Sequence, residues 1–138
     1  MRIIACGDAL FSSRNLARRL PSQLVTLFQD ADAVFANAEF CCPRMGTAPA
    51  PRRFITAVRP EVLDEFVELN VRLLSFANNH TGDFGGQGVI DTIEEATARN
   101  LMAGGIGRSL DEARAARRRR RWAGTRILSG SSHPTIRP

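Results

Sequence analysis

Acidic, amide and imidazole side chains follow three short apolar segments of this sequence. After the first segment comes Asp8, after the second come Asn37 and Glu39, and after the third come Asn78, Asn79, His80 and Asp83. Carboxylate and amide oxygens together with an imidazole are ligands that suit a divalent metal ion. An imidazole beside such an ion can protonate a leaving group or bind the ion itself. The pattern therefore predicts a metal-assisted reaction site, provided that the fold brings these segment ends together.

The same residues also have ordinary structural interpretations. A Gly-Asp pair such as Gly7-Asp8 is common in turns after strands. Asn78 and Asn79 tolerate the unusual backbone angles of a loop, and a single histidine is more often a hydrogen-bonded structural residue than a ligand. The succession of three such segment ends favours a functional site, and spacing alone leaves both interpretations open.

The three apolar segments have the composition of buried strands, and helical patterns separate them. The expected strands are residues 2–6, 33–36 and 71–76, and the expected helices are residues 21–30, 60–69 and 87–100. Strands that alternate with helices predict a largely parallel, doubly wound α/β sheet with flanking helices. In such sheets, ligands bind outside the carboxyl ends of the strands, which is where the polar residues stand.

The remaining segments give weaker signals. Residues 9–20 are ambiguous and can hold a short helix, and residues 41–53 form a loop rich in proline and small residues. Ser109 and Glu112 form a capping box, which predicts a helix that carries on into the arginine run. Residues 125–129 are expected to form a fourth strand.

The charge of the chain is concentrated in one place. All 19 cationic residues are arginines and the net charge is +5, but Arg117 to Arg121 form one unbroken run. Without these five, 14 arginines face 14 acidic residues, so the body is neutral. Nucleic-acid-binding proteins usually spread their cations over a face, so this pattern disfavours nucleic acid as a partner. The alternative is a binding module whose basic tail, residues 117–138, takes nucleic acid or an anionic surface.

Length, hydropathy and cysteine usage set the class of protein. The 138 residues allow one ordinary domain. No apolar stretch approaches the length of a membrane helix, and the N-terminus does not have the pattern of a signal peptide. Three cysteines are an odd number, and Cys41 and Cys42 are adjacent, which is typical of free thiols in a reducing compartment. A cytoplasmic protein without a membrane span is therefore expected.

Three motifs resemble a known protein family. They are GDALFSSR at residues 7–14, ADAVFANAEF at residues 31–40, and the stretch that begins LLSFANNHTGDFGGQGV at residue 73. Together they resemble the CapA proteins of bacterial capsule and poly-γ-glutamate synthesis, and the resemblance covers residues 1–133. It implies a layered α/β fold similar to that of the calcineurin-type metallophosphoesterases.

The resemblance also implies roles for individual residues. Metal-binding positions are matched by Asp8, Glu39 and Asn79, the catalytic histidine by His80, and substrate-side positions by Asn37, Asn78, Asp83 and His133. The implied cofactor is a divalent metal ion (Mn²⁺, Zn²⁺ or Mg²⁺), and the implied substrate is an anionic small molecule or polymer. The helix near Gln87 would direct its N-terminal amides towards such an anion.

The sequence departs from the metallophosphoesterase pattern in two ways. Leu10 stands where these enzymes usually have a histidine, and His80 and His133 are the two histidines of the sequence. The later histidine motifs of the family are thus missing, and we expect a partial domain that corresponds to the N-terminal part of a family member. Residues 117–138 would be a basic, irregular tail.

Two functional expectations follow from the resemblance. The first is a CapA-like protein with a metal-dependent, phosphoesterase-type site edge, and the alternative is a non-catalytic fragment of the same fold. A partial sheet would leave an edge with exposed apolar side chains such as Val71, Leu73 and Phe76. Self-association through that edge is therefore expected.

Overall fold

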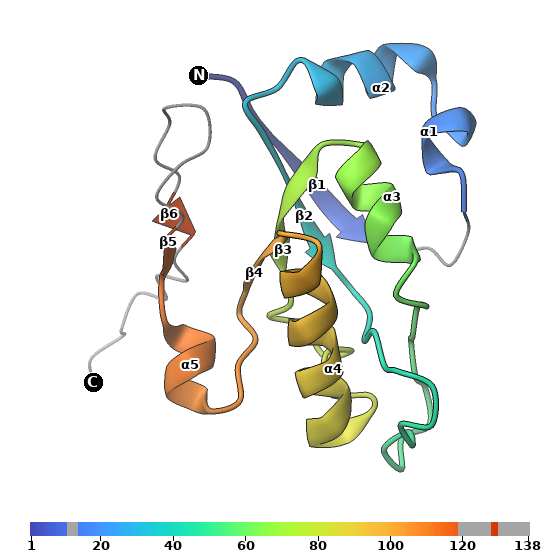
Figure 1. The fold of residues 1–138 in the computed structure, drawn as a ribbon, viewed down its shortest axis with the longest axis vertical. Coiled ribbons are helices and arrows are strands. Elements are labelled where there is room, and N and C mark those ends of the chain that lie inside the picture. The colour runs from blue at the N-terminus through green and yellow to red at the C-terminus, as the bar shows by residue number, and fades with distance from the viewer. Residues whose placement is uncertain (11–13, 119–127, 130–138) are drawn as a thin grey trace.

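The centre of the molecule is a parallel sheet. The computed structural model describes residues 1–10, 14–118 and 128–129, and in this part of the chain four parallel strands lie in the order β1-β2-β3-β4 (Figure 1). These strands are β1 (Ile3–Ala9), β2 (Ala33–Ala38), β3 (Val71–Ser75) and β4 (Met102–Gly104). The helices are α1 (Leu16–Arg19), α2 (Ser22–Gln29), α3 (Val62–Glu68), α4 (Gly85–Ala98) and α5 (Leu110–Arg114). The predicted layered α/β fold is thereby confirmed.

The fourth strand of the sheet is not the one expected from the sequence. It is β4, a segment of only three residues that pairs with β3. The expected strand at 125–129 contributes β6 (Leu128–Ser129), which pairs antiparallel with β5 (Arg117–Arg118) in a separate sheet. Residues 125–127 lie outside the described part of the chain.

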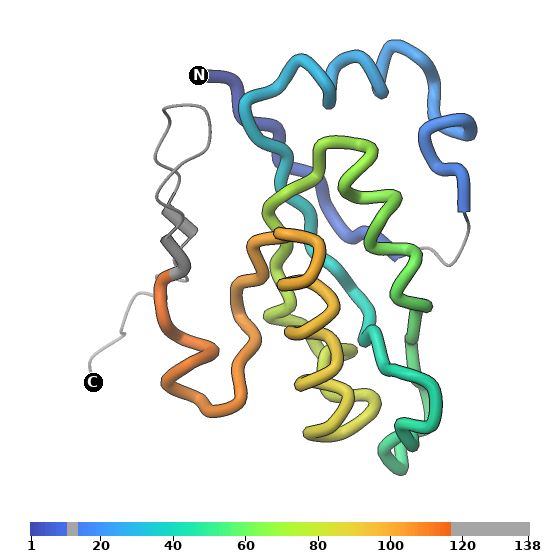
Figure 2. Tube along the Cα trace, viewed as in Figure 1, coloured from blue at the N-terminus to red at the C-terminus, as the bar shows by residue number. Residues whose placement is uncertain are grey.

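The connecting helices pack on one face of the sheet, whereas a doubly wound arrangement has helices on both faces. Each crossover leads to the next strand in the same direction, and right-handed crossovers then place every connecting helix on the same side. One core confirms this: Phe28 of α2, Leu63 of α3 and Ile93 of α4 share a cluster with Val34 and Leu74 of the sheet. The tube in Figure 2 follows these successive strand–helix units from blue to orange.

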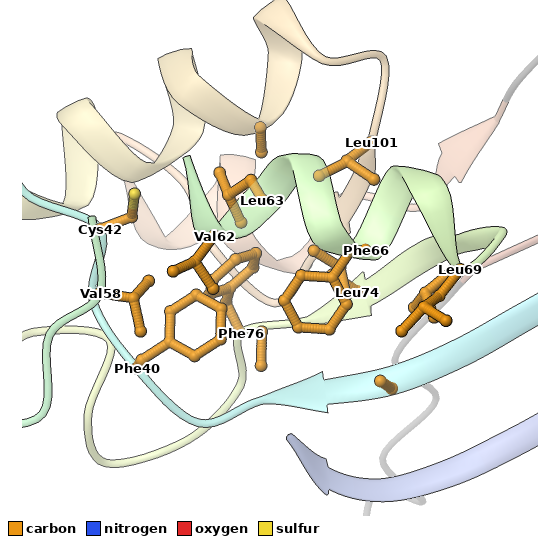
Figure 3. Close-up of a cluster of buried hydrophobic side chains, with 14 of the residues drawn as sticks. Phe40, Cys42, Val58, Val62, Leu63, Phe66, Leu69, Leu74, Phe76 and Leu101 are labelled. Carbon is orange, nitrogen blue, oxygen red and sulfur yellow. The ribbon is translucent and has the colours of Figure 1, made fainter. Parts of the chain in front are cut away.

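Three aromatic rings form the centre of this core (Figure 3). Phe40, Phe66 and Phe76 are each at most 2% exposed. The Phe40 ring centroid lies 5.9 Å from that of Phe66 and 6.0 Å from that of Phe76, the latter pair meeting edge to face. Edge-to-face geometry is favourable for aromatic quadrupoles. The cluster packs α3 and the segment after β2 against the end of β3.

The expected apolar edge is not present at β3. Val71, Leu73 and Phe76 are 3%, 5% and 0% exposed, so the prediction that they lie on an open edge is wrong. The reason is β4, which pairs with the free side of β3 and makes it an interior strand. Self-association through these side chains therefore loses its structural basis.

The helix that begins after Ser109 ends before the arginine run. Its N-cap is as predicted: the Ser109 hydroxyl accepts a hydrogen bond from the Glu112 amide at 3.1 Å. The helix stops at Arg114, because Ala115 takes an extended backbone conformation. Arg117 and Arg118 then lie in β5, so the prediction that the helix continues into the run is wrong.

Replacing Ser109 with alanine should cost about 1 kcal/mol of stability, because it removes the side-chain acceptor from the first turn of α5. Chemical denaturation followed by circular dichroism measures this loss. Ser22→Ala is the matched control, since Ser22 is the first residue of α2 and Pro21 occupies the N-cap there. Equal losses in the two variants would contradict the capping role.

Candidate functional site

An irregularity in β1 determines which residue faces β2 at the end of the sheet. Ala5 pairs with Phe35, but the next aligned pair is Asp8 with Asn37. Strand β1 thus advances three residues while β2 advances two. One extra residue of this kind re-aims the side chains that follow it. It places Asp8 opposite Asn37, and both lie within their strands rather than in the loops after them.

A series of hydrogen bonds runs across three strand ends from this pair. The Asn37 side-chain amide donates to Asp8 Oδ1 at 2.8 Å. The Asn78 amide donates to Asn37 Oδ1 at 3.2 Å and to the Ala38 carbonyl at 2.9 Å. The ends of β1, β2 and the loop after β3 are thereby joined, as the strand-end argument predicts.

The loop after β3 folds back on itself and positions His80. The Asn78 side-chain oxygen accepts the His80 amide at 3.0 Å. His80 Nδ1 lies 2.7 Å from Asp83 Oδ2. The imidazole is 18% exposed and the carboxylate only 1%, so the ring is held by a buried group while part of it reaches solvent.

A second loop, between β2 and α3, also donates hydrogen bonds to Asp83. The Thr56 amide donates to Asp83 Oδ2 at 2.7 Å, and the Arg52 guanidinium donates to Asp83 Oδ1 at 3.3 Å and to the Asn79 carbonyl at 2.8 Å. Neither Arg52 nor Thr56 is among the site residues predicted from the sequence. Both residues lie in an irregular segment without hydrophobic periodicity. Their contacts with Asp83, which is distant in the sequence, reveal their role.

Buried groups of α4 hold the beginning of this second loop. The Thr92 hydroxyl accepts the Cys42 amide at 2.9 Å. Asp91 accepts the Arg44 amide at 3.0 Å and the Thr47 hydroxyl at 2.6 Å. Because Asp91 and Thr92 are at most 1% exposed, these bonds are shielded from water and fix the loop to the helix.

A comparison with protein families shows the family of this chain. The family described as bacterial capsule synthesis protein PGA_cap matches residues 2–133, which include β1 to α5 and all the site residues named above. The chain belongs to this family. A comparison with curated proteins gave no match. None of the described helices of this family member has the length and apolar content that crossing a membrane requires.

The site residues predicted for this capsule synthesis family member are only partly brought together. The hydrogen-bonded series contains Asp8, Asn37, Asn78, His80 and Asp83. Glu39 and Asn79 lie next to it in the chain. Among the described residues they contact it through backbone atoms, the Glu39 amide on the Ala9 carbonyl and the Asn79 carbonyl on Arg52. His133 lies outside the described residues.

The charge state of Asp83 is set by competing effects. Burial of Asp83 would raise its pKa, but the hydrogen bonds from His80 and the Thr56 amide, with the charges of His80 and Arg52, outweigh burial and lower the pKa below its ordinary value. Asp83 is therefore an ionised acceptor at neutral pH. The His80 Nδ1 atom must then donate the hydrogen bond that joins them.

The donors at this edge match a metal ion in type but not in number. Asp8 and Glu39 offer carboxylate oxygens and Asn79 an amide oxygen, which are ligands for a hard divalent cation. Among the described residues, however, no three His, Cys, Asp or Glu side chains gather closely enough to hold a metal ion. An ion bound here would be held by few protein ligands.

Proposed function

We propose that this family member carries a hydrolytic edge for an anionic phosphoester, in a reaction of capsule or poly-γ-glutamate synthesis. The observation that supports it is the His80–Asp83 pair, 2.7 Å apart, next to the Asp8–Asn37 pair at the carboxyl end of the sheet. Such edges are where ligands bind in open parallel sheets.

In this proposal His80 is the general acid. Because Nδ1 donates to the ionised Asp83, Nε2 is the nitrogen that can carry a proton to the leaving oxygen. In this step a water molecule attacks phosphorus and loses a proton to solvent, the ester P–O bond breaks, and the leaving oxygen takes the proton of Nε2. Asp83 holds the imidazole ring in place. It also stabilises the charged imidazolium before the proton is transferred from Nε2 to the leaving oxygen. Arg52, held on Asp83 and half exposed, adds positive charge beside the site for an anionic substrate.

The same proposal assigns a divalent metal ion to Asp8, Glu39 and Asn79. When bound, the ion would supply charge that neutralises the phosphoryl oxygens. Two carboxylates and one amide predict weak binding. The roles of Asn37 and Asn78 are to orient Asp8 and the His80 loop, and α4, which begins two residues after Asp83, would direct its first amides towards an anion.

Calorimetry with Mn²⁺ and hydrolysis of a model phosphodiester test the proposal together. We expect weak Mn²⁺ binding that Asp8→Ala abolishes and that His80→Ala retains, whereas both variants should lose hydrolysis. Asp111→Ala, which removes an exposed carboxylate from α5, is the control. Unchanged Mn²⁺ affinity in Asp8→Ala would refute the metal assignment, and unchanged hydrolysis in His80→Ala would refute the role of His80.

A non-catalytic family member is the second candidate function. It is favoured by the finding that no three-residue metal cluster occurs among the described residues. This candidate predicts that a phosphoester binds at the edge without turnover at any Mn²⁺ concentration. Binding measured by calorimetry in the absence of product formation would support it over the hydrolytic edge.

A further inference from the structure

An apolar cavity adjoins the site edge. It has a volume of about 250 Å³ and lies between β1 and the helices α1, α2 and α3. Its walls include Cys6, Leu16, Leu20, Leu24, Phe28 and Phe66. Among the described residues that line the cavity, Asp8 is the one that carries a charge. Asp8 and Leu10 are the lining residues that are exposed to solvent.

The walls are suited to an apolar guest. Phe28 and Phe66 are 7% and 2% exposed and make up part of the closed side. Burial raises the pKa of the Cys6 thiol, so this group is neutral and adds to the apolar surface. Apolar cavities hold water poorly, because water finds few hydrogen-bond partners there; one of about 150 Å³ takes up a benzene molecule. A cavity of 250 Å³ has room for a larger group, of the size of a fused pair of aromatic rings or a short alkyl chain.

Asp8 connects the cavity to the edge. Its carboxylate accepts the Asn37 hydrogen bond at 2.8 Å, and the same residue lines the cavity. A ligand that bound at the edge through an anionic group could therefore extend a neighbouring organic group past Asp8 into the cavity.

We infer that the phosphoester taken by this edge carries an apolar aryl or alkyl group, and that the cavity between β1 and α1–α3 binds that group. The inference rests on the proposed function for the anionic half of the ligand. It distinguishes the substrate class from phosphates of sugars and other fully polar alcohols, whose hydroxyl groups would find few partners besides Asp8 among these walls.

The cavity is tested first with 2-naphthol, which has the apolar group and no phosphate and needs no metal ion. We expect calorimetry to show binding to the wild type and a loss of at least tenfold in affinity in Leu24→Trp, which fills the cavity. Leu27→Trp is the matched control, since Leu27 lies on the same helix, is 43% exposed and does not line the cavity. No binding to the wild type, or equal affinity in all three proteins, would overturn the inference.

Protection of Cys6 provides a second measurement that needs no variant that might fail to fold. Cys41 and Cys42 are 0% exposed, so among the cysteines Cys6 is the thiol open to N-ethylmaleimide. Bound 2-naphthol should slow the alkylation of Cys6 several-fold, as counted by mass spectrometry. An unchanged rate at a concentration that saturates the calorimetric signal would place the naphthol elsewhere and overturn the inference.

The link between cavity and edge is tested with 1-naphthyl phosphate and methyl phosphate in the presence of Mn²⁺. Tighter binding of the naphthyl ester in the wild type, with the advantage lost in Leu24→Trp, supports the inference, and equal binding of the two esters overturns it. If naphthol binds but no phosphoester is bound or hydrolysed, the proposed function fails while the cavity remains an apolar binding site.

Discussion

Replacing Phe40 with alanine should remove about 3–5 kcal/mol from the free energy of unfolding. The ring is 0% exposed and lies against both Phe66 and Phe76, so its loss leaves a cavity where three elements meet. Domains of this size are typically stable by only about 5–15 kcal/mol, so the loss is a large fraction of the total stability. Urea denaturation followed by circular dichroism gives the difference.

Phe54→Ala is the matched control for this experiment. Phe54 has the same side chain but is 73% exposed, with the Arg53 guanidinium 5.3 Å from its ring centroid. Its removal should change stability by no more than about 0.5 kcal/mol. Comparable losses in the two variants would show that the aromatic cluster does not hold the core together.

Acid should destabilise the protein through Asp83, and Asp83→Asn should weaken that dependence. The pKa of Asp83 is lower in the folded than in the unfolded chain, so its contribution is fully present above the unfolded value of about 3.9 and is lost as pH falls through the folded value. The asparagine variant should be about 2 kcal/mol less stable at neutral pH, because Arg52 and His80 lose their ionised partner. Below the folded pKa the difference should shrink.

Urea denaturation at pH 7, 5, 4 and 3 measures this difference. Asp91 also has a lowered pKa, but it is present in both proteins, so its effect cancels in the comparison. Asp111→Asn on exposed α5 is the control for removal of a carboxylate as such. Parallel pH curves for the wild type and Asp83→Asn would contradict the role given to this pair.

Much of the fold could be predicted because its signals are local. The spacing of Val62, Leu63 and Phe66 predicts a helix within residues 60–69, and the structure has α3 there and buries all three. Strand β4 was missed because Met-Ala-Gly has no β-branched residue and its pairing with β3 is a sequence-distant contact. The end of α5 was missed because arginine is a good helix former and no glycine or proline follows Arg114 until Gly124.

The site divides in the same way. The rule that parallel strands end at one edge was enough to predict that Asp8, Asn37 and Asn78 lie together. The rule does not give the register, and the extra residue in β1 decides that Asp8 rather than Gly7 faces Asn37. Arg52 could not be found either, because it precedes Asp83 by 31 residues in a loop without periodicity.

The order of the strands has a consequence for how the chain acquires its structure. The strands lie in the sheet in the same order as in the chain, from β1 to β4. During synthesis, each new strand can therefore pair with the edge of the strand made before it. No strand has to wait for a later segment to be inserted between two earlier ones. In this four-stranded sheet each pairing joins consecutive strand–helix units, so each pairing closes a loop no longer than one such unit. This sheet can therefore grow from its N-terminal strand while the ribosome is still delivering the rest of the chain.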